Sequence, residues 1–118
     1  MRNKSLLLVD DDETSSQILK FILEDEGYEV DLAATGEIAM SKISSRRYDL
    51  VLLDYILPDM KGRDVAARIK KVSPAPKIIL LTGYAESEGE PEDNSYDKIL
   101  LKPVPPQTIV SVIAGILH

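Results

Sequence analysis

Carboxylate, hydroxyl and ammonium side chains stand at the ends of four apolar segments of this 118-residue chain. The segments read "SLLLV", "YDLVLLD", "KIILLTG" and "KILLKP", and the polar residues at their ends are Asp10, Asp11, Asp54, Thr82 and Lys102. If the segments are neighbouring strands, three carboxylates gather in one place, which requires a countercharge such as a divalent cation. Oxygen ligands without histidine or cysteine favour Mg²⁺.

This set of groups suits phosphoryl chemistry. An aspartate can attack phosphorus and form an aspartyl-phosphate. Mg²⁺ and a lysine offset the charge on the transferring group, and a threonine hydroxyl can donate a hydrogen bond to one of its oxygens. Each residue alone has an ordinary explanation, because an aspartate after a strand often caps a turn or a helix and a lysine before a proline is usually solvated. The chemical interpretation depends on their joint position at successive strand ends.

The elements that must position these residues alternate between strand and helix. Strands are predicted at 5–9, 28–33, 48–54, 77–83 and 98–103, and helices at 14–27, 35–44, 63–72 and 105–117. Continuous apolar strands separated by helices predict an α/β fold with a parallel sheet covered on both faces. Ligands of such sheets bind outside the carboxyl ends of the strands, which is where the polar residues stand.

The apolar spacing predicts which helix faces are buried. In the first helix Ile18, Phe21 and Ile22 form the expected buried face, Thr14 and Gln17 could form a capping box, and a glycine ends the helix. The corresponding faces of the later helices are Ile38, Ala39 and Ile43; Val65, Ile69 and Val72; and Ile109, Ile113 and Ile116. Between 84 and 97 a further helix is due, but the segment is acidic, contains glycine and proline and has no apolar stripe, so we expect this fourth helix to be short or disordered.

Composition narrows the function classes. A net charge of −6 and the lack of a basic stripe argue against direct nucleic-acid binding. The chain has no cysteine, its single histidine is the last residue, and no apolar run is long enough for a signal peptide or a membrane span. We therefore expect residues 1–118 to form one cytoplasmic domain without membrane contact.

The motifs "LLLVDDDE", "YDLVLLDYILPDMKG", "KIILLTGYA" and "LLKP" resemble, in order and spacing, the CheY-like receiver domain of two-component response regulators. The resemblance covers essentially the whole chain and implies a flavodoxin-like, doubly wound sheet of five parallel strands in the order 2-1-3-4-5. It implies that Asp54 accepts the phosphoryl group. It also implies that Asp10, Asp11, Asp54 and the backbone carbonyl of Ile56 hold Mg²⁺, with Asp11 more direct than Asp10, and that Asp12 caps the first helix.

The resemblance assigns the remaining site residues as well. Thr82 matches the switch hydroxyl, Gly83 leaves room for the phosphoryl group, Lys102 binds phosphate, and the peptide bond before Pro103 is expected to be cis. Three positions depart from the family pattern, since the usual aromatic switch residue is Ile99, the usual aromatic after the proline is Val104, and the usual methionine before Pro58 is Leu57. The residues that would couple the site to an output surface are therefore the least typical part of the chain.

Two other functions compete. The spacing of Asp10, Asp12 and Thr14 resembles the nucleophile motif of haloacid-dehalogenase-type phosphatases, but residues 103–118 lack the acidic pair that this mechanism needs. A receiver-like binding module that works without phosphate is the other alternative, and the intact set of site residues argues against it.

The resemblance implies a signalling domain that is not an enzyme beyond its own phosphorylation and slow self-dephosphorylation. Slow loss is expected because Ile56 and Tyr84, which flank the path of the hydrolytic water, are bulky and cannot orient it. The expected partners are a sensor histidine kinase or histidine phosphotransfer protein, and a downstream protein or fused output domain. The domain is expected to be a monomer or a weak dimer.

Overall fold

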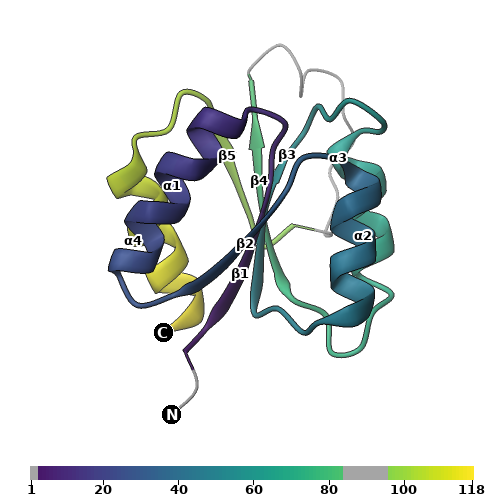
Figure 1. Ribbon diagram of the computed structural model, residues 1–118, viewed down its shortest axis with the longest axis horizontal. Coiled ribbons are helices and arrows are strands. Elements are labelled where there is room, and N and C mark those ends of the chain that lie inside the picture. The colour runs from purple at the N-terminus through teal and green to yellow at the C-terminus, as the bar shows by residue number, and fades with distance from the viewer. Residues whose placement is uncertain (1–2, 84–95) are drawn as a thin grey trace.

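The computed structural model describes residues 3–83 and 96–118 (Figure 1). Within these residues five strands form one sheet in the order β2-β1-β3-β4-β5, and every neighbouring pair is parallel. The strands are β1 (Ser5–Val9), β2 (Glu29–Ala33), β3 (Leu50–Asp54), β4 (Lys77–Thr82) and β5 (Lys98–Leu101). The predicted fold class and strand order are therefore confirmed.

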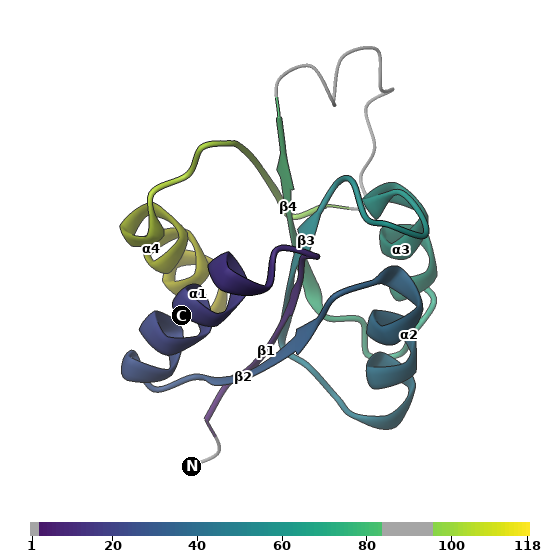
Figure 2. The same cartoon turned by 45° about the horizontal axis from the view of Figure 1, so that its top comes forward.

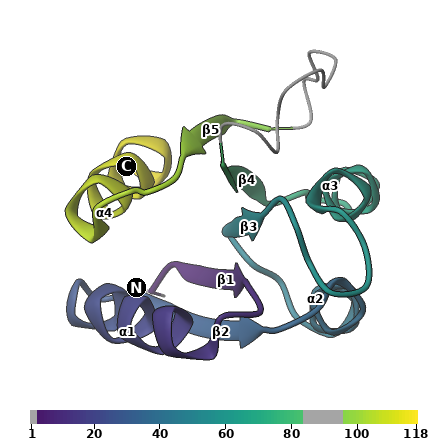
Figure 3. The same ribbon diagram turned by 90° about the horizontal axis from the view of Figure 1, so that it is seen from above.

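The helices cover both faces of the sheet. They are α1 (Glu13–Asp25), α2 (Gly36–Ser45), α3 (Gly62–Ile69) and α4 (Pro106–Leu117). Figure 3 shows α1 and α4 on one side and α2 and α3 on the other, and Figure 2 gives the same arrangement from a second direction. Strand side chains alternate between the two resulting cores, so that Leu7 and Val9 pack towards α2 and α3 while Leu6 and Leu8 pack towards α1 and α4.

The predicted buried face of the first helix is wrong at Ile18 and Phe21, whereas Ile22 is partly buried. Ile18 is 55% exposed and Phe21 is 74% exposed, whereas Ser16 and Leu23 are buried. The helix carries apolar residues around most of its circumference, so their spacing alone does not fix which face meets the sheet. The helix is rotated so that the face running from Ser16 to Leu23, with side chains spaced by three and four residues, packs against the core.

The start of α1 also differs from the predicted capping box. Asp12 is the N-cap residue, and its Oδ1 accepts a hydrogen bond from the Ser15 backbone N–H at 3.1 Å. Thr14 and Gln17 lie inside the helix and do not cap it. The family resemblance implied that Asp12 caps this helix, and the structure confirms it. A carboxylate placed three residues before an N–H group at the helix start can accept its hydrogen bond directly.

The other predicted faces are correct with small exceptions. In α2, Ala39 and Ile43 are buried as expected, but Ile38 is exposed. In α3, Val65 and Ile69 are buried. Val72 follows the end of that helix yet still packs against the core, and α4 buries Ile109 and Ile113 with Ile116 partly covered.

The predicted short or disordered fourth helix falls mainly on residues 84–95, which lie outside the described part of the chain. Among the described residues, no helix has the length and hydropathy needed to cross a membrane.

Candidate functional site

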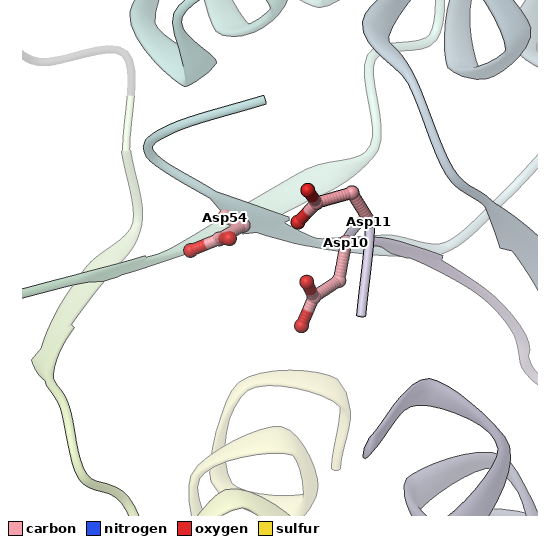
Figure 4. A group of neighbouring side chains, drawn as sticks. All are labelled: Asp10, Asp11 and Asp54. Atoms are coloured by element: carbon pink, nitrogen blue, oxygen red, sulfur yellow. The ribbon is translucent and has the colours of Figure 1, made fainter. Parts of the chain in front are cut away.

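Three carboxylates meet at the carboxyl ends of β1 and β3, which are adjacent in the sheet (Figure 4). Asp10 and Asp11 follow β1, and Asp54 is the last residue of β3. One oxygen of each carboxylate lies within 4.8 Å of the others. Asp54 is 5% exposed, Asp10 is half-buried and Asp11 is exposed, so the cluster runs from the sheet edge to the surface.

The crowding has an electrostatic consequence at Asp10. Burial raises the pKa of its carboxyl, and the neighbouring charges of Asp11 and Asp12 raise it further. The Asp12 backbone N–H, which donates to Asp10 Oδ1 at 3.0 Å, and the charge of Lys102 act in the opposite direction. Burial is therefore the main reason that the pKa of Asp10 lies above its ordinary value.

Lys102, which follows the edge strand β5, supplies a positive charge to this cluster. Its Nζ forms an ion pair with Asp54 Oδ1. Its backbone N–H donates to the Thr82 carbonyl at 2.9 Å, which ties the start of the β5–α4 loop to the end of β4. The peptide bond between Lys102 and Pro103 is cis, the isomer that the resemblance implies.

Thr82 ends the strand that lies between Asp54 and Lys102. In the register of β3 and β4, Asp54 is opposite Leu81, so Thr82 stands one residue further along. Its side chain is buried, and its hydroxyl donates to the Gly83 carbonyl at 3.2 Å. The sheet therefore brings the predicted acceptor, switch and phosphate-binding residues to one edge.

The loop from β3 to α3 contains Ile56, the predicted backbone ligand, two residues beyond Asp54. The Ile56 side chain is 44% exposed, and Ile56 forms an isolated antiparallel bridge with Lys61. Gly62 closes the loop against the site: a Cβ at this position would lie 2.6 Å from the Asp54 carbonyl oxygen. Only glycine permits this approach without moving the backbone of Asp54.

Sequence reasoning missed one residue of this loop. Asp59, which reads as ordinary loop polarity in "LPDMKG", accepts hydrogen bonds from the backbone N–H groups of Gly36 and Glu37, both at 2.9 Å. These donors lower the pKa of the Asp59 carboxyl. No local sequence pattern predicts this contact, because Asp59 is more than twenty residues from Gly36 and Glu37 in the chain.

The three atypical positions have different surroundings. Ile99 lies on the edge strand β5 and is 50% exposed, whereas Leu57 is buried with the α2 and α3 core. Val104 is partly buried and packs against the α1 and α4 core. The side chain of Ile99 is thus half exposed at the edge of the sheet.

The donor set fits a hard divalent cation. The clustered side chains offer carboxylate oxygens, and the chain contains no cysteine that would favour a softer metal. Three carboxylates within 4.8 Å also provide the negative charge that such an ion requires. The side chains that could hold Mg²⁺ are Asp10, Asp11 and Asp54.

The order of the strands and the acidic edge define a flavodoxin-like α/β protein whose site lies between β1 and β3, where the crossovers reverse direction. The model of the response regulator receiver domain matches residues 6–114. The chain therefore belongs to the response regulator receiver domain family, and its CheY-like, two-component character is established by this match.

Individual relatives agree with this assignment. A CheY-like receiver domain protein from Methanospirillum hungatei is 36% identical with a TM-score of 0.87, over 98% of this chain and 94% of that one. The response regulator TrrA from Thermotoga maritima, solved in complex with Mg²⁺ and BeF, is 36% identical with a TM-score of 0.86, over 97% and 99%. The transcriptional regulatory protein SrrA of Staphylococcus aureus is 31% identical over 98% of this chain, which spans about half (48%) of SrrA.

Proposed function

We propose that this receiver domain accepts a phosphoryl group on Asp54 in the presence of Mg²⁺ and changes conformation in response. The observation that carries the proposal is the placement of the buried Asp54 carboxylate between two other carboxylates and the Lys102 ammonium. Family membership establishes a signalling domain, and this geometry supports a particular acceptor.

The proposed transfer is a substitution at phosphorus. An oxygen of ionised Asp54 attacks the phosphorus of a phosphohistidine on a sensor kinase or phosphotransfer protein. The phosphorus–nitrogen bond breaks and its electron pair stays on the imidazole nitrogen, while a proton carried by the other ring nitrogen makes the leaving histidine neutral. Asp54 becomes an aspartyl-phosphate, and no oxidant or reductant is required.

We propose that Asp10, Asp11, Asp54 and the backbone carbonyl of Ile56 hold Mg²⁺, with Asp11 the more direct of the paired carboxylates. When bound, the ion offsets the negative charge on the transferring group. The carboxylate cluster supports this proposal, as does the complex of the 36%-identical TrrA with Mg²⁺ and BeF.

The remaining residues are proposed to detect the phosphoryl group. Lys102 would exchange its contact with Asp54 for a phosphoryl oxygen, and the Thr82 hydroxyl would exchange its contact with Gly83 for another. Gly83 leaves space at the same edge. These exchanges bias an equilibrium between two conformations that a partner reads, with Ile99 at the switch position.

We further propose slow self-dephosphorylation and no other enzymatic activity. Ile56 offers an exposed apolar side chain two residues after Asp54, which can neither orient nor activate water. The second residue of this argument, Tyr84, lies outside the described residues. Persistence of the aspartyl-phosphate for minutes rather than seconds is the expected behaviour.

The proposed setting is the cytoplasm, as a monomer or weak dimer that meets a histidine kinase or phosphotransfer protein. The output is proposed to reside in a downstream protein or fused domain, because SrrA is a transcriptional regulatory protein of about twice the matched length. Residues 1–118 themselves, with a net charge of −6, are proposed to make no direct contact with nucleic acid or membrane.

The phosphatase alternative is disfavoured by one specific contact. That mechanism needs Asp12 as an acid and base beside the nucleophile, but the Asp12 carboxylate caps α1 through the Ser15 N–H. The receiver assignment therefore accounts for Asp12 without further chemistry.

Intact-mass measurement after incubation with Mg²⁺ and acetyl phosphate tests the proposal on wild type, Asp54→Asn and Asp10→Asn. One added phosphoryl group on wild type and none on Asp54→Asn is the expected result. Label that survives Asp54→Asn but disappears in Asp10→Asn would support the phosphatase instead. If acetyl phosphate labels none of them, the same three proteins are incubated with a phosphorylated histidine phosphotransfer protein, and failure there would favour the phosphate-independent binding module.

A further inference from the structure

We propose that Asp59 is a positioning residue for the metal site: it fixes the β3–α3 loop to the start of α2 and thereby holds the Ile56 carbonyl where Mg²⁺ can use it. The inference rests on the proposed Mg²⁺ site. Asp59 does not contact the reacting atoms, and its effect is exerted through the backbone of the loop.

The contact uses both oxygens of the Asp59 carboxylate. Oδ1 accepts from the Gly36 N–H and Oδ2 from the Glu37 N–H, each at 2.9 Å. These amides belong to the first turn of α2, where backbone N–H groups lack partners within the helix and the helix dipole favours a negative charge. The side chain of Thr35, the N-cap of α2, accepts a hydrogen bond from the Ile38 N–H at 3.1 Å, while the Gly36 and Glu37 N–H groups donate to Asp59. The loop therefore supplies a cap that α2 does not supply for itself.

A second contact strengthens the same junction. The Met60 side chain packs so closely over Gly36 that a Cβ there would lie 2.5 Å from Met60 Cγ and Sδ. Adjacent loop residues thus hold α2 by a polar and an apolar contact. The position of the loop tip is consequently defined by α2 rather than by the loop alone.

The base of the loop is fixed as well, which leaves Ile56 between two anchors. Gly62 packs against the Asp54 backbone, and the Leu57 N–H donates to the Met60 carbonyl at 3.2 Å. The Ile56 side chain is 44% exposed and is therefore only partly held by packing. The orientation of its carbonyl therefore depends on the backbone restraints at either end of the loop.

Loss of the Asp59 contact releases one of these restraints. The freed loop samples more conformations, and Mg²⁺ binding then has to order it, which lowers affinity. Asp59→Asn retains one acceptor oxygen but turns an amide group towards a helix N–H, so it keeps at most one of the two hydrogen bonds. Asp59→Ala keeps neither. The two variants should form a graded series.

Mg²⁺ titration followed by amide chemical shifts in two-dimensional NMR measures this effect without reference to phosphorylation. We expect Asp59→Ala to bind Mg²⁺ about tenfold more weakly than wild type, at the lower end of what residues that orient metal ligands contribute, with Asp59→Asn between them. The amide signals of residues 55–57 should broaden or shift in the metal-free variants, while those of β1 stay in place.

Thr35→Ala is the matched control, since it removes the other cap of α2 and leaves the loop contact intact. It should lower the stability of the fold as Asp59→Ala does, with Mg²⁺ affinity within twofold of wild type. Asp64→Asn controls for the loss of one nearby exposed negative charge and should also bind normally.

Each other outcome overturns the inference. Wild-type affinity in both Asp59 variants would show that the loop holds its position without the contact. Equal weakening by Thr35→Ala would attribute the effect to the general stability of α2. Absence of Mg²⁺ binding by the wild-type protein would reject the proposed metal site together with the inference, and is distinguished from the first outcome by the wild-type titration itself.

Discussion

The ammonium group of Lys102 reaches Oδ1 of Asp54 across the carboxyl edge of the sheet, from the loop after β5 to the end of β3, with β4 between them. Asp54 is buried beside two other carboxylates. When all three carboxylates are ionised, their summed negative charge exceeds the charge of Lys102 by two. A divalent cation at the proposed Mg²⁺ site would match that excess.

Removal of the lysine charge is expected to destabilise the metal-free protein. In Lys102→Met the Asp54 carboxylate stays buried without this partner, and we expect a loss of about 1–3 kcal/mol in the free energy of unfolding. Saturating Mg²⁺ should reduce the loss. Urea denaturation with and without Mg²⁺ measures both values. Lys98→Met, which removes an exposed lysine from the start of β5, should change stability by no more than about 0.5 kcal/mol. An equal loss in both variants would mean that the ion pair contributes nothing.

Two glycines should respond oppositely to the same substitution. Gly62→Ala places a Cβ 2.6 Å from the Asp54 carbonyl oxygen and 2.9 Å from Tyr55 Cα. Both are backbone atoms, which cannot shift without straining the chain. We expect Gly62→Ala to destabilise the fold by about 1–3 kcal/mol. Gly115→Ala lies in α4 with nothing within 4 Å of the new Cβ, and should stabilise by about 0.5–1 kcal/mol. Thermal denaturation compares them, and a neutral Gly62→Ala would contradict the tight approach of Gly62 to the Asp54 backbone.

Sequence patterns predicted the fold because buried parallel strands leave a simple signal. The run Ser5–Val9 is buried throughout and was predicted with the correct bounds, and Leu50–Asp54 is likewise buried. The first helix was harder, since Ile18 and Phe21 are apolar yet exposed. A helix with apolar residues on several faces is oriented by the sheet beneath it, and that information is not local.

The residues of the candidate site also differ in how far the sequence predicts them. Residues at strand ends were predictable, because parallel strands deliver their carboxyl ends to one edge whatever the intervening loops do. Asp59 was not, since its role follows from where α2 begins relative to a loop distant in the chain. Contacts of this kind depend on packing between elements and have no signature in spacing or composition.

The Asp59 contact should also depend on pH. Hydrogen bonds from Gly36 and Glu37 lower the pKa of the Asp59 carboxyl below the ordinary value of 3.8. A group whose pKa is lower in the folded state stabilises the fold above its unfolded pKa and loses this contribution as pH falls through the folded pKa. The stability difference between wild type and Asp59→Asn should therefore be constant near neutral pH and narrow below 3.8. Denaturant titrations across this range measure it, with Thr35→Ala as a variant whose difference should not follow the same curve. A constant difference down to strongly acidic pH would contradict the contact.

Replacement of a buried serine is expected to stabilise the protein. The Ser16 side chain is 4% exposed in α1, and among the described residues its Oγ has no hydrogen-bond partner. A buried hydroxyl without a partner is unfavourable, and alanine has the higher helix propensity. Ser16→Ala should therefore raise the free energy of unfolding by about 0.5–1.5 kcal/mol. Ser15→Ala, an exposed neighbour in the same turn, should gain only the smaller propensity contribution. Equilibrium urea unfolding of both variants separates the two effects, and a destabilised Ser16→Ala would show that the hydroxyl has a partner that holds α1 in place.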